Sequence, residues 1–179
     1  GTSYNIHYIS NIPEDKVQKG IDSIFYVINK SLSTYLPQSD ISKINRGDTT
    51  AVVDHHFRAV FEKATEVWKA TDGYFDPTVG ALVNAYGFGP AKAINELNLQ
   101  QKDSLLALTG WQKVKLKNDH TVVKESPLIY LDFNALAKGY VVDVIGDYLH
   151  QMGNKSYMVE IGGEIVTKGN SPKTGQAWK

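Results

Sequence analysis

An apolar run that leads directly into a long helical pattern constrains the fold more than any other feature of this chain. Residues 128–133 read LIYLDF, an apolar stretch of strand length. A helical pattern follows from about Ala135 to Met152, and Gly153 is placed to end it. A strand that passes straight into a long helix needs both kinds of element in one core, so this region predicts helices packed on a sheet.

The rest of the chain alternates between helical and strand patterns. Further helices are expected from Pro13 to about Lys30, after an Asp54 cap until Gly73, from Asp76-Pro77 through about Tyr86, and near Leu105. Strands are expected over residues 4–8, in a hairpin of residues 111–116 and 120–124, and in a hairpin of residues 155–161 and 164–169 about Gly162-Gly163. This mixture, without an internal repeat, predicts one α+β domain over residues 1–179.

Composition excludes several classes of function. The 179 residues are 42% hydrophobic and 21% charged, which is ordinary for a soluble globular protein. Lysine plus arginine equal aspartate plus glutamate at 19 each, so no net field favours nucleic acid. The absence of cysteine removes disulfides, thiolate catalysis and cysteine metal sites.

The Lys-Gly pair at the start of the long helical pattern outlines an anion site. With Asn134 as the helix cap, Lys138 falls in the first turn, where backbone N–H groups lack helical partners. Gly139 would let a ligand approach closely. On these residues alone, a solvated Lys138 paired with Asp132 or Asp143 is the favoured interpretation.

Two other segments also allow both a structural and a ligand-binding interpretation. In residues 72–90, Asp76 is either an N-cap or part of a polar and aromatic grip on a ring system, and the cap is favoured from spacing alone. In VEIGGEI, a plain hairpin turn is favoured over a close backbone approach to a ligand. His55 and His56 are expected to point to different faces of a helix as surface residues.

Five motifs in this order together resemble one family. They are GTSYNIHY, LSTYLPQSDISKIN, GYFDPTVGALVNAYGFGP, LDFNALAKGYVVDVIGDYL and YMVEIGGEI, and they resemble the ApbE family of FAD:protein FMN transferases, formerly called thiamine biosynthesis lipoproteins. The resemblance covers the whole chain but only the N-terminal portion of such a protein. It implies an ApbE-like (T-fold-like) mixed sheet with packed helices, present here as an incomplete part of the full domain and truncated at the C-terminus.

The resemblance also implies the residues of the site. The positions that match FAD contacts are Tyr35, Tyr74, Phe75, Asp76, Asp132 and Lys138. Ala135 matches a position whose backbone carbonyl coordinates magnesium. We expect the general base and the remaining magnesium ligands beyond Lys179, so no catalytic residue is assigned within the chain. We also expect Asp76→Ala to weaken FAD binding and to leave the fold intact.

The activity implied is Mg²⁺-dependent transfer of FMN from FAD to a threonine or serine hydroxyl of a target flavoprotein, with release of AMP. Two alternatives stay open at this point: a Mg²⁺-dependent FAD pyrophosphatase that yields FMN and AMP, and an FAD-binding protein without turnover. The family further implies a bacterial lipoprotein on the periplasmic or extracytoplasmic face, with its lipid anchor upstream of Gly1. No partner nucleic acid is expected.

Overall fold

The computed structural model describes residues 2–90, 92–94 and 96–178, and these form two compact units. Unit 1 contains Gly1–Ile28 and Ala135–Lys179, and unit 2 contains Asn29–Asn134. Gly1, which opens the first motif, lies outside the described residues. The mixture of helices and strands confirms the α+β class, whereas the single domain over residues 1–179 stays a prediction.

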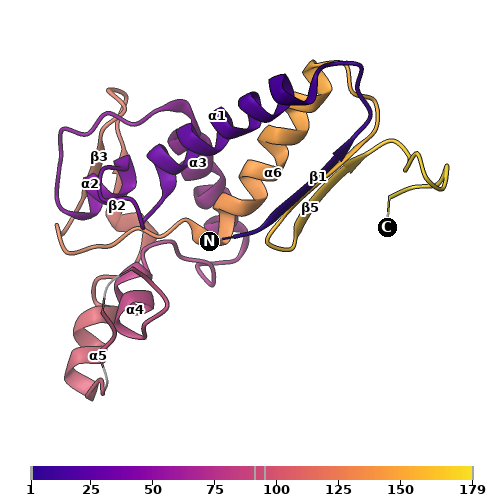
Figure 1. Ribbon diagram of the computed structural model, residues 1–179. Helices are drawn as coiled ribbons and strands as arrows, with labels where there is room; N and C mark the ends of the chain where they lie inside the picture. The colour runs from indigo at the N-terminus through magenta and orange to yellow at the C-terminus, as the bar shows by residue number, and fades with distance from the viewer. Residues whose placement is uncertain (1, 91, 95, 179) are drawn as a thin grey trace. The chain divides into compact units, whose positions relative to one another are not determined.

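Unit 1 is a three-stranded antiparallel sheet covered on one face by helices (Figure 1). Its elements are β1 (Tyr4–Tyr8), most of α1 (Glu14–Leu32), α6 (Asn134–Gln151), β4 (Tyr157–Ile161) and β5 (Glu164–Lys168), with strand order β1-β4-β5. Alternate residues of β4 are buried, because successive side chains of a strand point to opposite faces. The predicted first strand and last hairpin are therefore confirmed.

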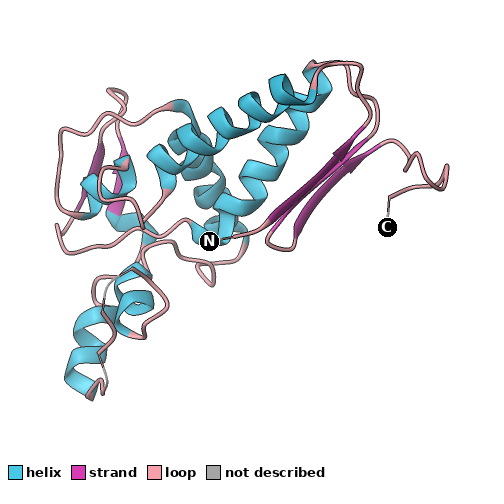
Figure 2. Ribbon diagram, in the orientation of Figure 1, coloured by secondary structure: helices cyan, strands magenta, loops and turns pink. Residues whose placement is uncertain are grey.

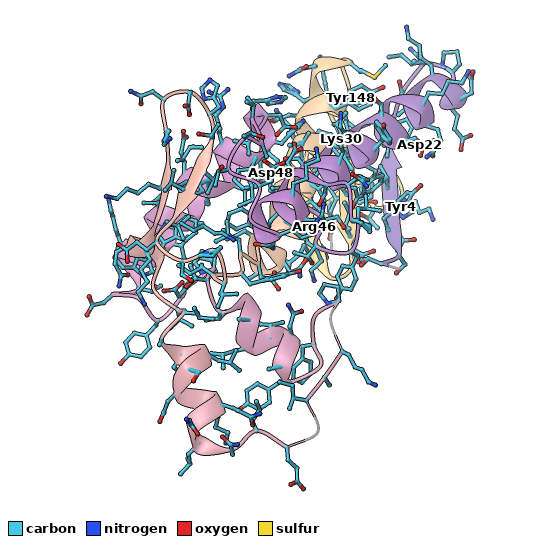
Figure 3. The ribbon with its side chains drawn as sticks, turned by 90° about the vertical axis from the view of Figure 1, so that its left-hand side faces the viewer. Tyr4, Asp22, Lys30, Arg46, Asp48 and Tyr148 are labelled. Atoms are coloured by element: carbon cyan, nitrogen blue, oxygen red, sulfur yellow. The ribbon has the colours of Figure 1, made fainter. Side chains whose placement is uncertain are left out.

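Two glycines allow the helices of unit 1 to pack closely. A side chain at Gly20 of α1 would collide with the ring of Tyr148 of α6. A side chain at Gly146 would press on Val166 and Tyr157, at 3.1 and 3.3 Å from its Cβ position. On α1, the Gln18 amide donates to the Tyr4 hydroxyl at 3.3 Å and to the Asp22 carboxylate at 2.8 Å. Figure 3 labels Tyr4 and Asp22.

Unit 2 has the helix α3 (His55–Ala70) in its core. The Asp54 side chain accepts a hydrogen bond from the Phe57 N–H at 2.8 Å, which confirms Asp54 as the cap. Phe57 meets Phe133 edge to face at 5.4 Å, and Phe61 lies 4.5 Å from Trp111, so aromatic side chains form the centre of the core. The other elements are α2 (Asp40–Asn45), α4 (Gly80–Ala85), α5 (Leu99–Leu106), the turn η1 (Trp111–Lys113), β2 (Val114–Leu116) and β3 (Val122–Lys124).

The strand predicted over residues 128–133 is wrong. This segment is drawn as loop (Figure 2) and has one isolated bridge, between Tyr130 and Val79. The Asn45 side chain takes the place of a neighbouring strand: its amide donates to the Leu131 carbonyl at 2.9 Å, and its oxygen accepts from the Leu131 N–H at 2.8 Å. Leu131 therefore has paired backbone groups without a continuous ladder.

Three predicted element boundaries are also wrong. The third helix begins at Gly80 instead of Asp76-Pro77, because the Asp76 carboxylate accepts from the Thr78 N–H and holds a turn there. The strand predicted from residue 111 begins at Val114, after η1. Asn134 is the first residue of α6 and not its cap; its N–H donates to the Asp132 carboxylate at 2.7 Å.

The two adjacent histidines differ from the prediction as well. His56 is buried, with 7% of its surface exposed, whereas a surface position was expected. The rings of His55 and His56 lie 3.9 Å apart, so they do not point to different faces. Burial lowers the pKa of His56, the nearby His55 lowers it further, and Asp54 raises it.

No helix in the described part of the chain is both long enough and apolar enough to span a bilayer.

We predict that Asn45→Ala destabilises the protein by on the order of 3 kcal/mol, because the Leu131 N–H and carbonyl both lose their partner in a half-buried place. Urea unfolding followed by tryptophan fluorescence measures the loss. Asn11→Ala, at an exposed position, is the control and should leave the midpoint in place. An Asn45→Ala midpoint equal to that of the wild type would contradict the bridging role.

We also predict that stability falls as pH drops. Because the pKa of His56 is lowered in the folded state, the unfolded chain takes up a proton at higher pH. The contribution of neutral His56 is therefore complete above a pH of about 6.5 and is lost as pH falls below that value. His56→Gln should reduce the decrease in melting temperature between about pH 7 and about pH 5. The same substitution at the exposed His7 is the control, and an unchanged decrease in His56→Gln would count against the prediction.

Candidate functional site

The segment Tyr74–Asp76 is a loop held at both ends by hydrogen bonds. At its start, the Phe75 N–H donates to the Thr71 hydroxyl at 3.0 Å, and the Tyr74 N–H donates to the Thr71 carbonyl at 3.1 Å. The Tyr74 side chain is 96% exposed, although its backbone is fixed. A held backbone that presents an aromatic ring to solvent is the arrangement expected of a preformed contact surface.

At the end of this loop, Asp76 joins segments that are far apart in the sequence. One carboxylate oxygen accepts from the N–H and the hydroxyl of Thr78, at 2.8 and 2.5 Å. The other accepts from the Trp111 N–H at 2.9 Å. The Gly110 N–H donates to the Thr78 hydroxyl at 2.7 Å, so residues 76–78 and 110–111 are fastened together.

Asp132 lies beside the same loop. Its N–H donates to the Pro77 carbonyl at 2.8 Å. A side chain at Gly80 would come within 2.7 Å of the Tyr130 carbonyl and 3.2 Å of the Asp132 Cβ, so the start of α4 packs directly on this strand-like segment. The structure thus brings together the segments that carry two of the predicted ligand contacts, Asp76 and Asp132.

Tyr35 is carried by the link between α1 and α2. Its ring is 60% exposed, and its N–H donates to the Ser33 hydroxyl at 3.3 Å. The Ser39 hydroxyl donates to the Ser33 carbonyl at 2.6 Å and accepts from the Ser42 N–H at 3.2 Å, which fixes the link on α2. Tyr35 is therefore available to a ligand, on a segment separate from the Tyr74–Asp76 loop.

In unit 1, Lys138 lies over the last hairpin. Its ammonium donates to the Gly162 carbonyl at 3.2 Å and stands 3.7 Å from the Glu164 carboxylate. The ion pair of Lys138 is therefore with Glu164, and not with Asp132 or Asp143 as predicted for a solvated lysine. A side chain built at Gly139 meets nothing within 4 Å. That a ligand approaches at this glycine stays a prediction.

The turn whose Gly162 carbonyl accepts the hydrogen bond of Lys138 has backbone angles suited to glycine. Gly162 and Gly163 have φ of 55° and 93°, the pattern of a two-residue turn with both central residues left-handed. The Glu160 carboxylate accepts from the Gly163 N–H at 2.7 Å and from the Asn5 amide at 2.8 Å. These two donors, the Gly163 N–H first, lower the pKa of Glu160. The plain hairpin interpretation of VEIGGEI is confirmed.

The described residues do not by themselves fit a magnesium site. The predicted ligand, the Ala135 carbonyl, belongs to the first turn of α6. Among the described residues, no group of three or more histidine, cysteine, aspartate or glutamate side chains is arranged to hold a metal ion. Magnesium takes six oxygen ligands and one carbonyl supplies only one of them, so the metal part of the prediction has no support here.

A concave surface of unit 1 lies apart from the predicted residues. Its volume is about 710 Å³, and its walls come from β1, Met158 and residues 171–178, with His7, Tyr8 and Glu14 among them. None of the seven predicted positions lines it. Burial raises the pKa of Tyr8, and Glu14 adds to this effect.

A comparison with models of known families tests the resemblance that the five motifs indicate. A sequence model of the ApbE family matches residues 1–179. The chain belongs to the ApbE family. The family resemblance drawn from the five motifs is therefore confirmed.

Relatives and solved structures agree with this membership. The chain is 36% identical over its whole length to an FAD:protein FMN transferase of Vibrio cholerae and 33% identical to one of Haemophilus influenzae. It spans about half the length of these curated relatives, 55% in each. It superposes on the flavin transferase ApbE from Vibrio cholerae with a TM-score of 0.94 and 35% identity, over 99% of this chain and 59% of that one. The apo flavinyl transferase ApbE of Pseudomonas stutzeri gives 0.89 and 30%, over 98% and 57%.

Sequence reasoning missed Thr71, Thr78 and Trp111, which hold the Tyr74–Asp76 loop. A signal for Thr78 was present. The pattern Asp-x-Thr occurs at residues 48–50, 76–78 and 119–121, and in each the aspartate accepts from both the N–H and the hydroxyl of the threonine. For Trp111 the sequence shows only a large apolar side chain. This does not indicate that its backbone N–H donates to the Asp76 carboxylate.

The hydrogen bonds of Asp76 change the expectation that Asp76→Ala leaves the fold intact. Three donors lose their acceptor, so we predict a loss of on the order of 2 kcal/mol in the free energy of unfolding, measured in urea. Asp119→Ala breaks the same local turn at an exposed place and is the matched control, for which a smaller loss is expected. Equal losses in the two variants would show that the contact to Trp111 adds nothing.

Proposed function

We propose that the protein transfers FMN from FAD to a threonine or serine hydroxyl of a target flavoprotein and releases AMP. Support comes from membership of the ApbE family and from relatives named FAD:protein FMN transferase at 33 to 36% identity. The observation that carries the proposal is the held loop Tyr74–Asp76, which presents an exposed aromatic ring on a segment that carries Asp76 and lies next to Asp132. That combination suits a ring system with polar edges.

In this proposal the residues of the chain bind and orient FAD. Tyr74 and Tyr35 offer exposed rings for stacking, and Asp132 offers hydrogen-bond acceptors to the polar edges of the dinucleotide. Lys138, half exposed beside the open space at Gly139, offers a cation to the diphosphate. Catalysis of phosphoryl transfer consists largely of holding the reacting phosphorus in line with the attacking hydroxyl. We therefore assign to residues 1–179 the role of positioning FAD.

The proposed reaction breaks one bond and forms one. The acceptor hydroxyl attacks the FMN-side phosphorus, the bond to the bridging oxygen breaks, and AMP leaves with that oxygen. The hydroxyl proton passes to a general base that we place outside residues 1–179. FMN then remains joined to the acceptor through a phosphoester.

Two further parts of the proposal rest on the family alone. We propose that transfer depends on Mg²⁺, with the Ala135 carbonyl as one ligand; the ion would stabilise charge on the diphosphate. We also propose that the protein works at the bacterial cell envelope, on the periplasmic or extracytoplasmic face, held by a lipid anchor upstream of Gly1.

Mass spectrometry of an acceptor protein tests the function directly. The full-length protein is incubated with FAD, Mg²⁺ and a flavoprotein that carries an acceptor threonine, and we predict that the acceptor gains the mass of FMN minus water while AMP appears in equal amount. Replacement of the acceptor threonine by valine is the control and should abolish the gain. Free FMN and AMP without labelled acceptor would identify a pyrophosphatase instead. FAD binding without any product would identify a binding protein, and omission of Mg²⁺ tests the metal dependence.

A further inference from the structure

We infer that Thr78 is a positioning residue for the dinucleotide, acting through Asp76 on the loop that carries Tyr74 and Phe75. This inference rests on the proposed function, because it assigns the loop a role in binding FAD. It concerns a residue that makes no predicted contact with the ligand itself.

The Thr78 side chain is buried and joins two segments that are 32 positions apart in the sequence. Its exposed fraction is 0%, and its hydroxyl donates to the Asp76 carboxylate at 2.5 Å. The same hydroxyl accepts from the Gly110 N–H at 2.7 Å. Both roles of the hydroxyl are therefore used, and a side chain of the same shape without oxygen would leave both neighbours without this partner.

The chain offers an internal comparison that separates this arrangement from an ordinary turn. At Asp48 and Thr50 (Figure 3 labels Asp48), the aspartate accepts from the threonine N–H at 2.8 Å and from its hydroxyl at 2.7 Å, as Asp76 does with Thr78. Those bonds join exposed residues two positions apart. At Asp76 and Thr78 the same turn is part-buried, with Thr78 fully buried, and it bonds to residues 32 and 35 positions further along. The long-range bonds are thus additional to the turn.

The second of these segments is anchored in the core of unit 2. Trp111, whose N–H donates to Asp76, is 3% exposed. Its indole N–H donates to the Thr65 hydroxyl at 2.9 Å, and its ring lies 4.5 Å from Phe61. Through Trp111 the end of the loop is therefore bonded to the aromatic core of unit 2, in addition to the bonds that its start forms with Thr71.

The physical consequence is preorganisation of the contact surface. A loop that is already ordered loses little conformational freedom when a ligand binds, whereas a released loop must be ordered at the expense of affinity. Loss of the Thr78 hydroxyl should therefore weaken FAD binding while the bound complex, once formed, reacts at a similar rate.

Thr78→Val and Thr78→Ser in the full-length protein test this inference. We expect Thr78→Val to raise the Kd and KM for FAD about tenfold with kcat changed less than about twofold, and Thr78→Ser to restore wild-type values. Kd is measured by quenching of FAD fluorescence and the kinetic constants by the rate of acceptor labelling. An unchanged Kd in Thr78→Val, or a failure of serine to restore it, would overturn the inference.

Two control variants separate positioning from a general loss of stability. Thr50→Val and Thr121→Val each break an exposed copy of the same turn and leave the bonds of Asp76 in place. Both should keep the wild-type Kd for FAD. If either control weakens binding as much as Thr78→Val at equal melting temperature, the effect is not specific to Thr78 and the inference is overturned.

The unmodified protein gives a second test if Thr78→Val does not fold. Saturating FAD should slow amide hydrogen exchange at Gly110 and Trp111, because binding favours the fastened loop. Unchanged exchange at both amides would overturn the inference. A wild-type protein that neither binds FAD nor labels the acceptor would instead remove the proposed function, so the two failures are distinguishable.

Discussion

The hydrogen bonds accepted by the Asp76 carboxylate are the interaction on which the candidate site of unit 2 depends. They join the loop Tyr74–Asp76 to Trp111 and, through Thr78, to Gly110. Residues 76–78 and 110–111, which flank the segment that carries α4 and α5, are thus held side by side. Asp76 was a candidate helix cap, but its carboxylate accepts the hydrogen bonds that join these segments, and α4 begins at Gly80.

Within unit 1, close packing places the predicted contact Lys138. Gly146 lets α6 rest on Tyr157 and Val166, and the turn at Gly162 offers its carbonyl to Lys138. A lysine so placed has its ion pair with Glu164 at 3.7 Å and remains half exposed, which keeps its charge available to an anion. Lys138 thus has its support within unit 1.

Sequence periodicity predicted the elements whose stability is local or comes from one buried face. The cap at Asp54, the helix α3, the last hairpin with Gly162-Gly163 and most of α6 follow from patterns read within a few residues. Periodicity did not predict the places where a side chain forms hydrogen bonds with backbone groups far away in the sequence. Asn45 replaces a strand partner for Leu131 across 86 positions, and no local pattern contains that information.

The sequence by itself determined the α+β class, the order of the motifs and through them membership of the ApbE family, because these are carried by residue types at short spacing. Only the tertiary structure decided how the candidate residues are held. It fastened Asp132 beside Pro77, turned Lys138 toward Gly162 and Glu164, and gave Thr78 its two partners. The physical reason is that each of these contacts joins atoms that the chain brings together only when the cores of its units are packed.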